Sequence, residues 1–137
     1  MFKTIMVPVD LAHKDLVQRG VDVACDLAAH YDATMHLVGV TAAAPGRAAH
    51  SPAELTAKLH AFADNLAARH GIRVQTKTVV SHDPAVDLED RLGEAAGEIG
   101  ADLVVMSSHK PGIMDFFFTS HAGTLATHTD LSVFIVR

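Results

Sequence analysis

The sequence predicts an α/β domain in which helices cover both faces of a five-stranded parallel sheet. Three observations predict this doubly wound class. Short apolar or β-branched runs alternate along the chain with longer segments of helical periodicity. Those segments are long enough to be crossover connections between parallel strands. The run Leu103–Met106 contains no polar residue, as expected of a strand that is buried on both faces.

The first third of the chain predicts a strand, a helix and a second strand. Residues 5–9 are an apolar run ended by Asp10, and residues 15–30 place apolar side chains at helical spacing. Residues 34–40 are again short and β-rich. The stretch 41–47 has no period and contains Pro-Gly, which is typical of a loop.

A second helix is predicted to begin after Ser51. The Ser51 side chain can cap the first turn, Pro52 suits the first helical position, and Glu54 can reach back to the capping residue. We expect this helix to run to Arg69, because Gly71 follows as a helix breaker.

The second half of the chain predicts an edge strand, a helix, a buried strand and a last apolar strand. Residues 72–78 alternate apolar and polar side chains, which is typical of a strand with one wet face at a sheet edge. Asp83 opens a helix that reaches about Ile99. The buried run 103–106 is the fourth strand and residues 133–136 are the fifth, with one short helix expected over about 120–128.

Composition limits the classes of function. A chain of 137 residues fits one domain, 1–137, with 49% hydrophobic and 20% charged residues. A formal charge of -5 offers no basic surface for nucleic acid. No apolar run is long enough to cross a membrane. The single Cys25 and the absence of a signal-peptide pattern favour a cytoplasmic location.

Unusual residues follow the first and the fourth predicted strands. Asp10 ends the first, and Ser107-Ser108-His109-Lys110 continues the fourth. In doubly wound sheets a ligand lies outside the carboxyl ends of the strands where the winding reverses. Asp10 could hydrogen-bond a ribose or a base edge there, or it could cap the following turn.

A second polar group, Thr119-Ser120-His121, falls at a predicted helix start. Backbone N–H groups and hydroxyls at such a position can bind an anion, and Lys110 could add a positive charge. An ordinary capped helix after a surface loop is the alternative that these residues alone favour.

The whole chain resembles the single-domain universal stress proteins. The resemblance rests on Ile5-Met6-Val7-Pro8-Val9-Asp10, on residues 101–109 and on Ser132-Val133-Phe134-Ile135-Val136-Arg137. It implies the adenine nucleotide alpha hydrolase-like fold, with strand order 3-2-1-4-5, and a non-enzymatic stress-response module that binds ATP or AMP.

The phosphate-binding pattern of that family is altered here. Nucleotide-binding members carry Gly, two residues, Gly, nine residues, then Gly and Ser or Thr. These glycines fall on Ser107, Lys110 and Thr119, so all three are missing, while Ser120 keeps the final hydroxyl. The spacing is one residue shorter, and Ser108-His109-Lys110-Pro111 resembles a bacterial branch that reads Ser-His-Arg-Pro. Because glycine allows the backbone to approach a phosphate closely, we expect contacts to the adenosine and to a single phosphate rather than to a triphosphate.

The resemblance implies a set of nucleotide-binding residues, with Pro8, Asp10 and Val40 at the adenosine end. The expected set is Pro8, Val9, Asp10, Val40, Ser107, Ser108, His109, Lys110, Thr119, Ser120 and His121.

Three other functions compete with this one. The alternative is a nucleotide-free dimerisation module that acts through protein partners, which the missing glycines favour. A phosphoryl-transfer enzyme would need a Gly-x4-Gly-Lys loop and an acidic cluster, and this chain has neither. A phosphoacceptor receiver domain would need an Asp after the third strand, which is also missing here. The ten histidines show no metal-ligand spacing, so no metal site is expected.

The last strand is predicted to form a homodimer. Val133, Phe134, Ile135 and Val136 are all apolar, and the expected order places them at an open edge that carries no Lys, Pro or inward charge. The family resemblance implies antiparallel pairing with a second copy across a two-fold axis. The third strand, with Arg73, Gln75 and Lys77, is better suited to remain an exposed edge.

Overall fold

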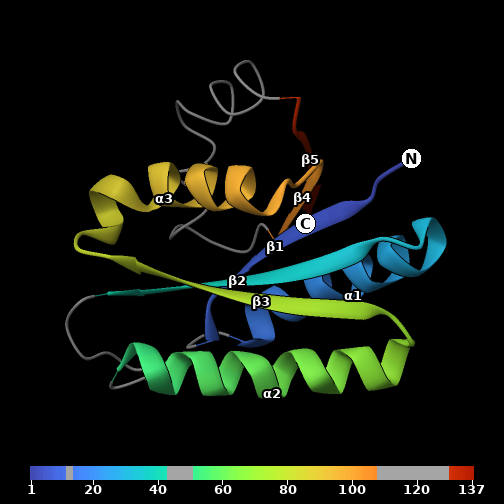
Figure 1. The fold of residues 1–137 in the computed structure, drawn as a ribbon, viewed down its shortest axis with the longest axis horizontal. Helices are drawn as coiled ribbons and strands as arrows, with labels where there is room; N and C mark the ends of the chain where they lie inside the picture. The colour runs from blue at the N-terminus through green and yellow to red at the C-terminus, as the bar shows by residue number, and fades with distance from the viewer. Residues whose placement is uncertain (12–13, 43–50, 108–129) are drawn as a thin grey trace.

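The computed structural model describes residues 1–11, 14–42, 51–107 and 130–137 (Figure 1). The predicted strands and long helices are found within a few residues of their expected bounds. The predicted short helix over 120–128 lies outside the described residues. In chain order the elements are β1 (Thr4–Val9), α1 (Lys14–Tyr31), β2 (Thr34–Ala42), α2 (Pro52–His70), β3 (Arg73–Ser81), α3 (Pro84–Ile99), β4 (Leu103–Ser107) and β5 (Ser132–Val136).

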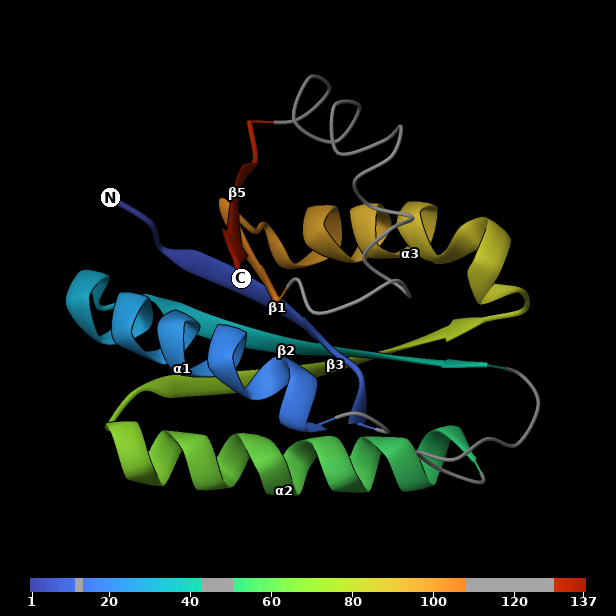
Figure 2. The same ribbon diagram turned by 180° about the vertical axis from the view of Figure 1, so that it is seen from behind.

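The five strands form one parallel sheet in the order β3-β2-β1-β4-β5, which confirms the predicted order. Helices α1 and α2 lie on one face of the sheet and α3 lies on the other (Figures 1 and 2). The two faces have separate cores. Ile5 and Met35 belong to the core under α1 and α2, whereas Met6 and Val104 belong to the core under α3.

The ends of α2 follow the predicted signals. Ser51 has an extended backbone, and its hydroxyl accepts a hydrogen bond from the Glu54 N–H at 3.1 Å. Gly71 adopts a left-handed φ of 63°, and its N–H donates to the Ala67 carbonyl at 2.9 Å. Capping at both ends therefore fixes the length of α2 by satisfying backbone groups that the helix leaves unpaired.

Strand β3 is an edge of the sheet with polar residues on it, as predicted. Arg73 donates from Nη1 to the Asp32 carboxylate at 3.0 Å and from Nε to the Thr34 hydroxyl at 3.2 Å. On the face under α2, the hydroxyls of Thr78 and Thr56 lie 2.8 Å apart. Polar contacts therefore help to hold β3 against β2 and α2.

None of the helices in the described part of the chain is long and apolar enough to cross a membrane.

His36 is a half-buried histidine on β2, on the face covered by α3. Burial lowers its pKa from the usual 6.5, and the nearby positive charge of Lys77 lowers the pKa further. Protonation of His36 therefore favours the unfolded chain.

His36 should make the protein sensitive to mild acid. Its contribution to folding is complete above the unfolded pKa of 6.5 and is lost as the pH falls toward the lower folded value. In His36→Gln, we expect the free energy of unfolding to change less than in the wild type between pH 7 and about 5.5. Urea titrations at several pH values measure this, with the exposed His82→Gln as the control. Identical pH profiles for wild type and His36→Gln would contradict the assignment.

Candidate functional site

The carboxyl ends of β1 and β2 bring Asp10 and Val40 together. The register of these strands runs from Thr4↔Thr34 to Val9↔Gly39. Asp10 follows directly after the last paired residue of β1 and Val40 directly after its partner Gly39, and both residues are partly exposed. The two residues expected at the adenosine end of a nucleotide therefore lie side by side, at the edge where ligands of doubly wound sheets bind.

The pairing between β1 and β4 ends early. Within the described residues of these strands, the paired residues are Ile5↔Leu103 and Met6↔Val104, although β1 continues to Val9 and β4 to Ser107. This is the point in the sheet order where the winding reverses, because β2 lies on one side of β1 and β4 on the other. At this switch point, the carboxyl ends of β1 and β4 are therefore not paired with each other.

Ser107 ends β4, but its hydroxyl is engaged by α1. The Ser107 Oγ accepts a hydrogen bond from the Gly20 N–H at 3.1 Å and donates to the Val17 carbonyl at 3.2 Å. A Cβ added at Gly20 would lie 2.1 Å from that Oγ. Gly20 is therefore required for the close approach of α1 to β4. The side chain of Ser107 anchors the end of β4, and its backbone remains the part that can meet a ligand.

The remaining expected site residues fall into two groups. Pro8 and Val9 lie in β1, at the switch point. Ser108, His109, Lys110, Thr119, Ser120 and His121 lie outside the described residues.

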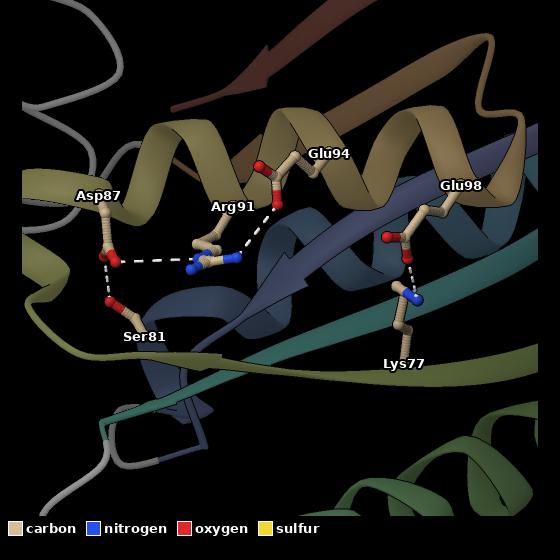
Figure 3. Close-up of polar contacts among 6 residues, drawn as sticks. All are labelled: Lys77, Ser81, Asp87, Arg91, Glu94 and Glu98. Carbon is tan, nitrogen blue, oxygen red and sulfur yellow. Dashed lines mark hydrogen bonds and ion pairs between the residues drawn. The ribbon is translucent and has the colours of Figure 1, made fainter.

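The sequence reasoning missed a polar cluster at the carboxyl end of β3. Ser81 is fully buried, and its hydroxyl donates to the carboxylate of Asp87 in the first turn of α3 (Figure 3). Arg91 lies between two carboxylates, 3.8 Å from Asp87 and 3.2 Å from Glu94. One local signal could have indicated this cluster: Ser81 ends a strand, and Asp87 follows in the first turn of the next helix.

A second ion pair ties the other half of α3 to β3. Lys77 of β3 contacts the Glu98 carboxylate of α3 (Figure 3). Lys77 and Arg91 are thus already neutralised by carboxylates. The Lys77–Glu98 pair joins α3 to the edge strand, whereas both partners of Arg91 lie within α3. With carboxylate partners already in place, neither cation is a suitable ligand for a phosphate.

Cys25 is an inert thiol in the core under α1. Its side chain is fully buried, and its pKa is raised from 9.0 to about 11, mainly by burial and to a smaller extent by the charges of Asp22 and Asp26. The thiolate is the reactive form, so Cys25 behaves as a small hydrophobic residue at neutral pH.

Metal chemistry has no visible basis in the part of the chain that the structure describes. No group of three or more His, Cys, Asp or Glu side chains is arranged to hold an ion among those residues.

Comparison with known proteins decides the family. The sequence matches the universal stress protein family over residues 1–137. The chain belongs to the universal stress protein family. Universal stress protein G of Escherichia coli O157:H7 is 32% identical over 148 aligned residues, which cover 100% of both chains.

Solved universal stress proteins share the fold. One, in complex with cAMP, superimposes with a TM-score of 0.67 at 22% identity and covers 99% of this chain and 97% of its own. Another, from Archaeoglobus fulgidus in complex with dAMP, gives 0.64 at 17% identity, with 98% of each chain covered. These similarities confirm the adenine nucleotide alpha hydrolase-like architecture of this universal stress protein.

The contact between Gly20 and Ser107 predicts a strong coupling between these positions. Gly20→Ala should destabilise the protein by about 1–3 kcal/mol, because the new Cβ displaces the Ser107 hydroxyl. With Ser107→Gly already present, the same change should cost much less, because only the backbone N of residue 107, 3.3 Å from the new Cβ, remains close and alanine favours a helix. Denaturant unfolding of the wild type, both single variants and the double variant measures this coupling.

A matched control for this cycle lies in α3. A Cβ added at the exposed Gly97 would meet no atom within 4 Å, so Gly97→Ala should stabilise the protein. Additive effects of Gly20→Ala and Ser107→Gly would contradict the anchoring role of Ser107.

Proposed function

We propose that this universal stress protein binds an adenine nucleotide, AMP or ATP, at the carboxyl ends of β1 and β4. The protein would act as a regulatory or stress-response module and catalyse no reaction. The observation that carries this proposal is the early end of the β1–β4 pairing at Met6, beside the adjacent residues Asp10 and Val40. A carboxylate and an apolar side chain at a switch point suit a ribose and an adenine ring.

The charges of the described residues favour a ligand with few phosphates. Arg91 and Lys77 are both paired with carboxylates of α3. Ser107 uses its hydroxyl on α1. The described residues would therefore contribute binding energy mainly through the adenosine part of the ligand. AMP would then bind with nearly the same affinity as ATP. Structures of other universal stress proteins that hold cAMP and dAMP support an adenine ligand.

A nucleotide-free dimerisation module acting through protein partners is the second candidate. The observation that favours it is the same engagement of Ser107 by α1, because the hydroxyl that replaces the first glycine of the family is not available to a phosphate. The two candidates differ in whether the purified protein binds nucleotide at all.

Asp10 provides the direct test of nucleotide binding. Isothermal titration calorimetry with AMP should show binding by the wild type, and Asp10→Ala should weaken it by about 1–3 kcal/mol, because a polar group of the ligand loses its partner. Asp64→Ala removes an equivalent charge from the exposed surface of α2 and should leave the affinity unchanged. No heat and no thermal shift with millimolar AMP and ATP would reject nucleotide binding and promote the second candidate.

We also propose that the protein is a homodimer built on β5, through Val133, Phe134, Ile135 and Val136. Phe134 and Ile135 are large apolar side chains that remain 44% and 41% exposed. Among the described residues, β5 pairs only with β4, so its outer edge is available to a second copy. An apolar edge of this kind invites pairing unless something covers it.

Antiparallel self-pairing that uses the whole of β5 would be centred on Phe134, the middle residue of Ser132–Val136. The two Phe134 side chains would then face one another as a cross-strand aromatic pair. The exposed Arg137 would approach the partner's Asp130, which is also exposed. Opposite charges at the two ends of the paired strands would favour this register over a shifted one.

Charge placed on β5 should prevent dimer formation. In sedimentation velocity at tens of micromolar protein, the wild type should be a dimer, and Phe134→Lys or Ile135→Lys should give monomer or aggregate. Gln75→Lys adds the same charge to exposed β3 at the opposite edge and should leave the dimer intact. Gln75 is chosen over Lys77 on the same strand because a change at Lys77 would also break its ion pair with Glu98. A monomeric wild type, or a dimer that survives both changes in β5, would defeat the proposal.

A further inference from the structure

Pro8 stands where proline is rarely tolerated. It lies in β1, the middle strand of the sheet. Proline has no N–H to donate to a ladder, so within sheets it is confined mainly to edge strands and bulges. A rule broken at one position of an otherwise regular strand points to a functional constraint at that position.

Backbone hydrogen bonds show which neighbour Pro8 faces. The Lys3 carbonyl accepts from the Thr34 N–H of β2 at 2.9 Å, and the Thr4 carbonyl accepts from the Asp102 N–H, just before β4, at 3.0 Å. Successive residues of a strand direct their backbone groups to opposite sides. Even-numbered residues of β1 therefore face β4, so the ring nitrogen of Pro8 faces β4 as well.

This orientation explains the unequal pairing of β1. The ladder with β2 continues through Pro8↔Val38 to Val9↔Gly39, because it needs no N–H from Pro8. The ladder with β4 ends at Met6↔Val104, the last pair before Pro8 on that side. Extending this register would place Pro8 opposite Met106, and the carbonyl of the buried Val105 would be the acceptor for an N–H at position 8.

We propose that Pro8 is a positioning residue that keeps the carboxyl ends of β1 and β4 unpaired, and that this opening admits the nucleotide. A completed ladder would hold the two strand ends about 4.8 Å apart, the ordinary spacing of hydrogen-bonded strands. The missing N–H and the bulk of the proline ring oppose that spacing on the β4 side alone. The part of this inference that concerns nucleotide rests on the proposed function.

The test restores the N–H at position 8. In Pro8→Ala, the new backbone amide should donate to the Val105 carbonyl. This amide should therefore be protected from hydrogen exchange and show a scalar coupling through the hydrogen bond to the Val105 carbonyl carbon in NMR spectra. Affinity for AMP should fall about five- to tenfold, the effect of one competing hydrogen bond. Pro8→Val repeats both measurements with a residue that favours strands, in case the alanine variant folds poorly.

A matched control keeps the missing N–H but removes the ring. N-methylalanine at position 8 can be introduced by ligating a synthetic segment 1–24 to a chain that begins at Cys25. In this variant position 8 still offers no donor to the Val105 carbonyl, so the carbonyl carbon of Val105 should keep its wild-type chemical shift, whereas Pro8→Ala should change it. A shift like that of Pro8→Ala would overturn the role of the missing N–H.

The outcomes separate the two proposals. If the new amide of Pro8→Ala exchanges freely and shows no coupling, the role of Pro8 is overturned, whether or not nucleotide binds. A protected amide with unchanged AMP affinity overturns the link between the opening and the ligand. If the wild type binds no nucleotide, the proposed function fails, and protection of the new amide still establishes that Pro8 keeps the strands apart.

Discussion

The rest of the structure depends on the position of β1, which pairs with β2 on one side and with β4 on the other. The chain winds from β1 to β2 and β3 in one direction and returns to the other side of β1 with β4 and β5. The reversal places the carboxyl ends of β1 and β4 side by side at the switch point. Asp10, Val40 and Ser107 are brought to one edge by this winding, although they are far apart in the sequence.

Packing on the two faces fixes these strand ends by different means. On one face, Ser107 bonds to two backbone groups of α1, and Gly20 leaves room for the contact. On the other face, α3 is tied to the edge strand by Ser81 and Asp87 at one end and by an ion pair near the other. Both attachments use polar groups that a binding site could otherwise have used. Among the described residues, a ligand would therefore meet backbone groups and the side chains that follow β1 and end β2.

The sequence predicted the elements because their signals are local. Ser51 and Gly71 mark the ends of α2, and the alternation over residues 72–78 marks an edge strand. The strand order came from the family resemblance. The anchoring of Ser107 by α1 spans about 90 residues and depends on how a helix packs on a strand, so no local pattern indicates it. The direction in which Pro8 faces depends likewise on the register of β1 with both of its neighbours.

Chemical-shift mapping tests most directly whether an adenine nucleotide binds at the switch point. Titration of the isotopically labelled protein with AMP should move the backbone amide signals of Val9, Asp10, Val40 and Ser107 together, with one dissociation constant. The signals of Asp64 and Gln75, on α2 and the opposite edge strand, should remain in place. Unchanged spectra at millimolar AMP, or shifts confined to residues away from the ends of β1, β2 and β4, would contradict the account.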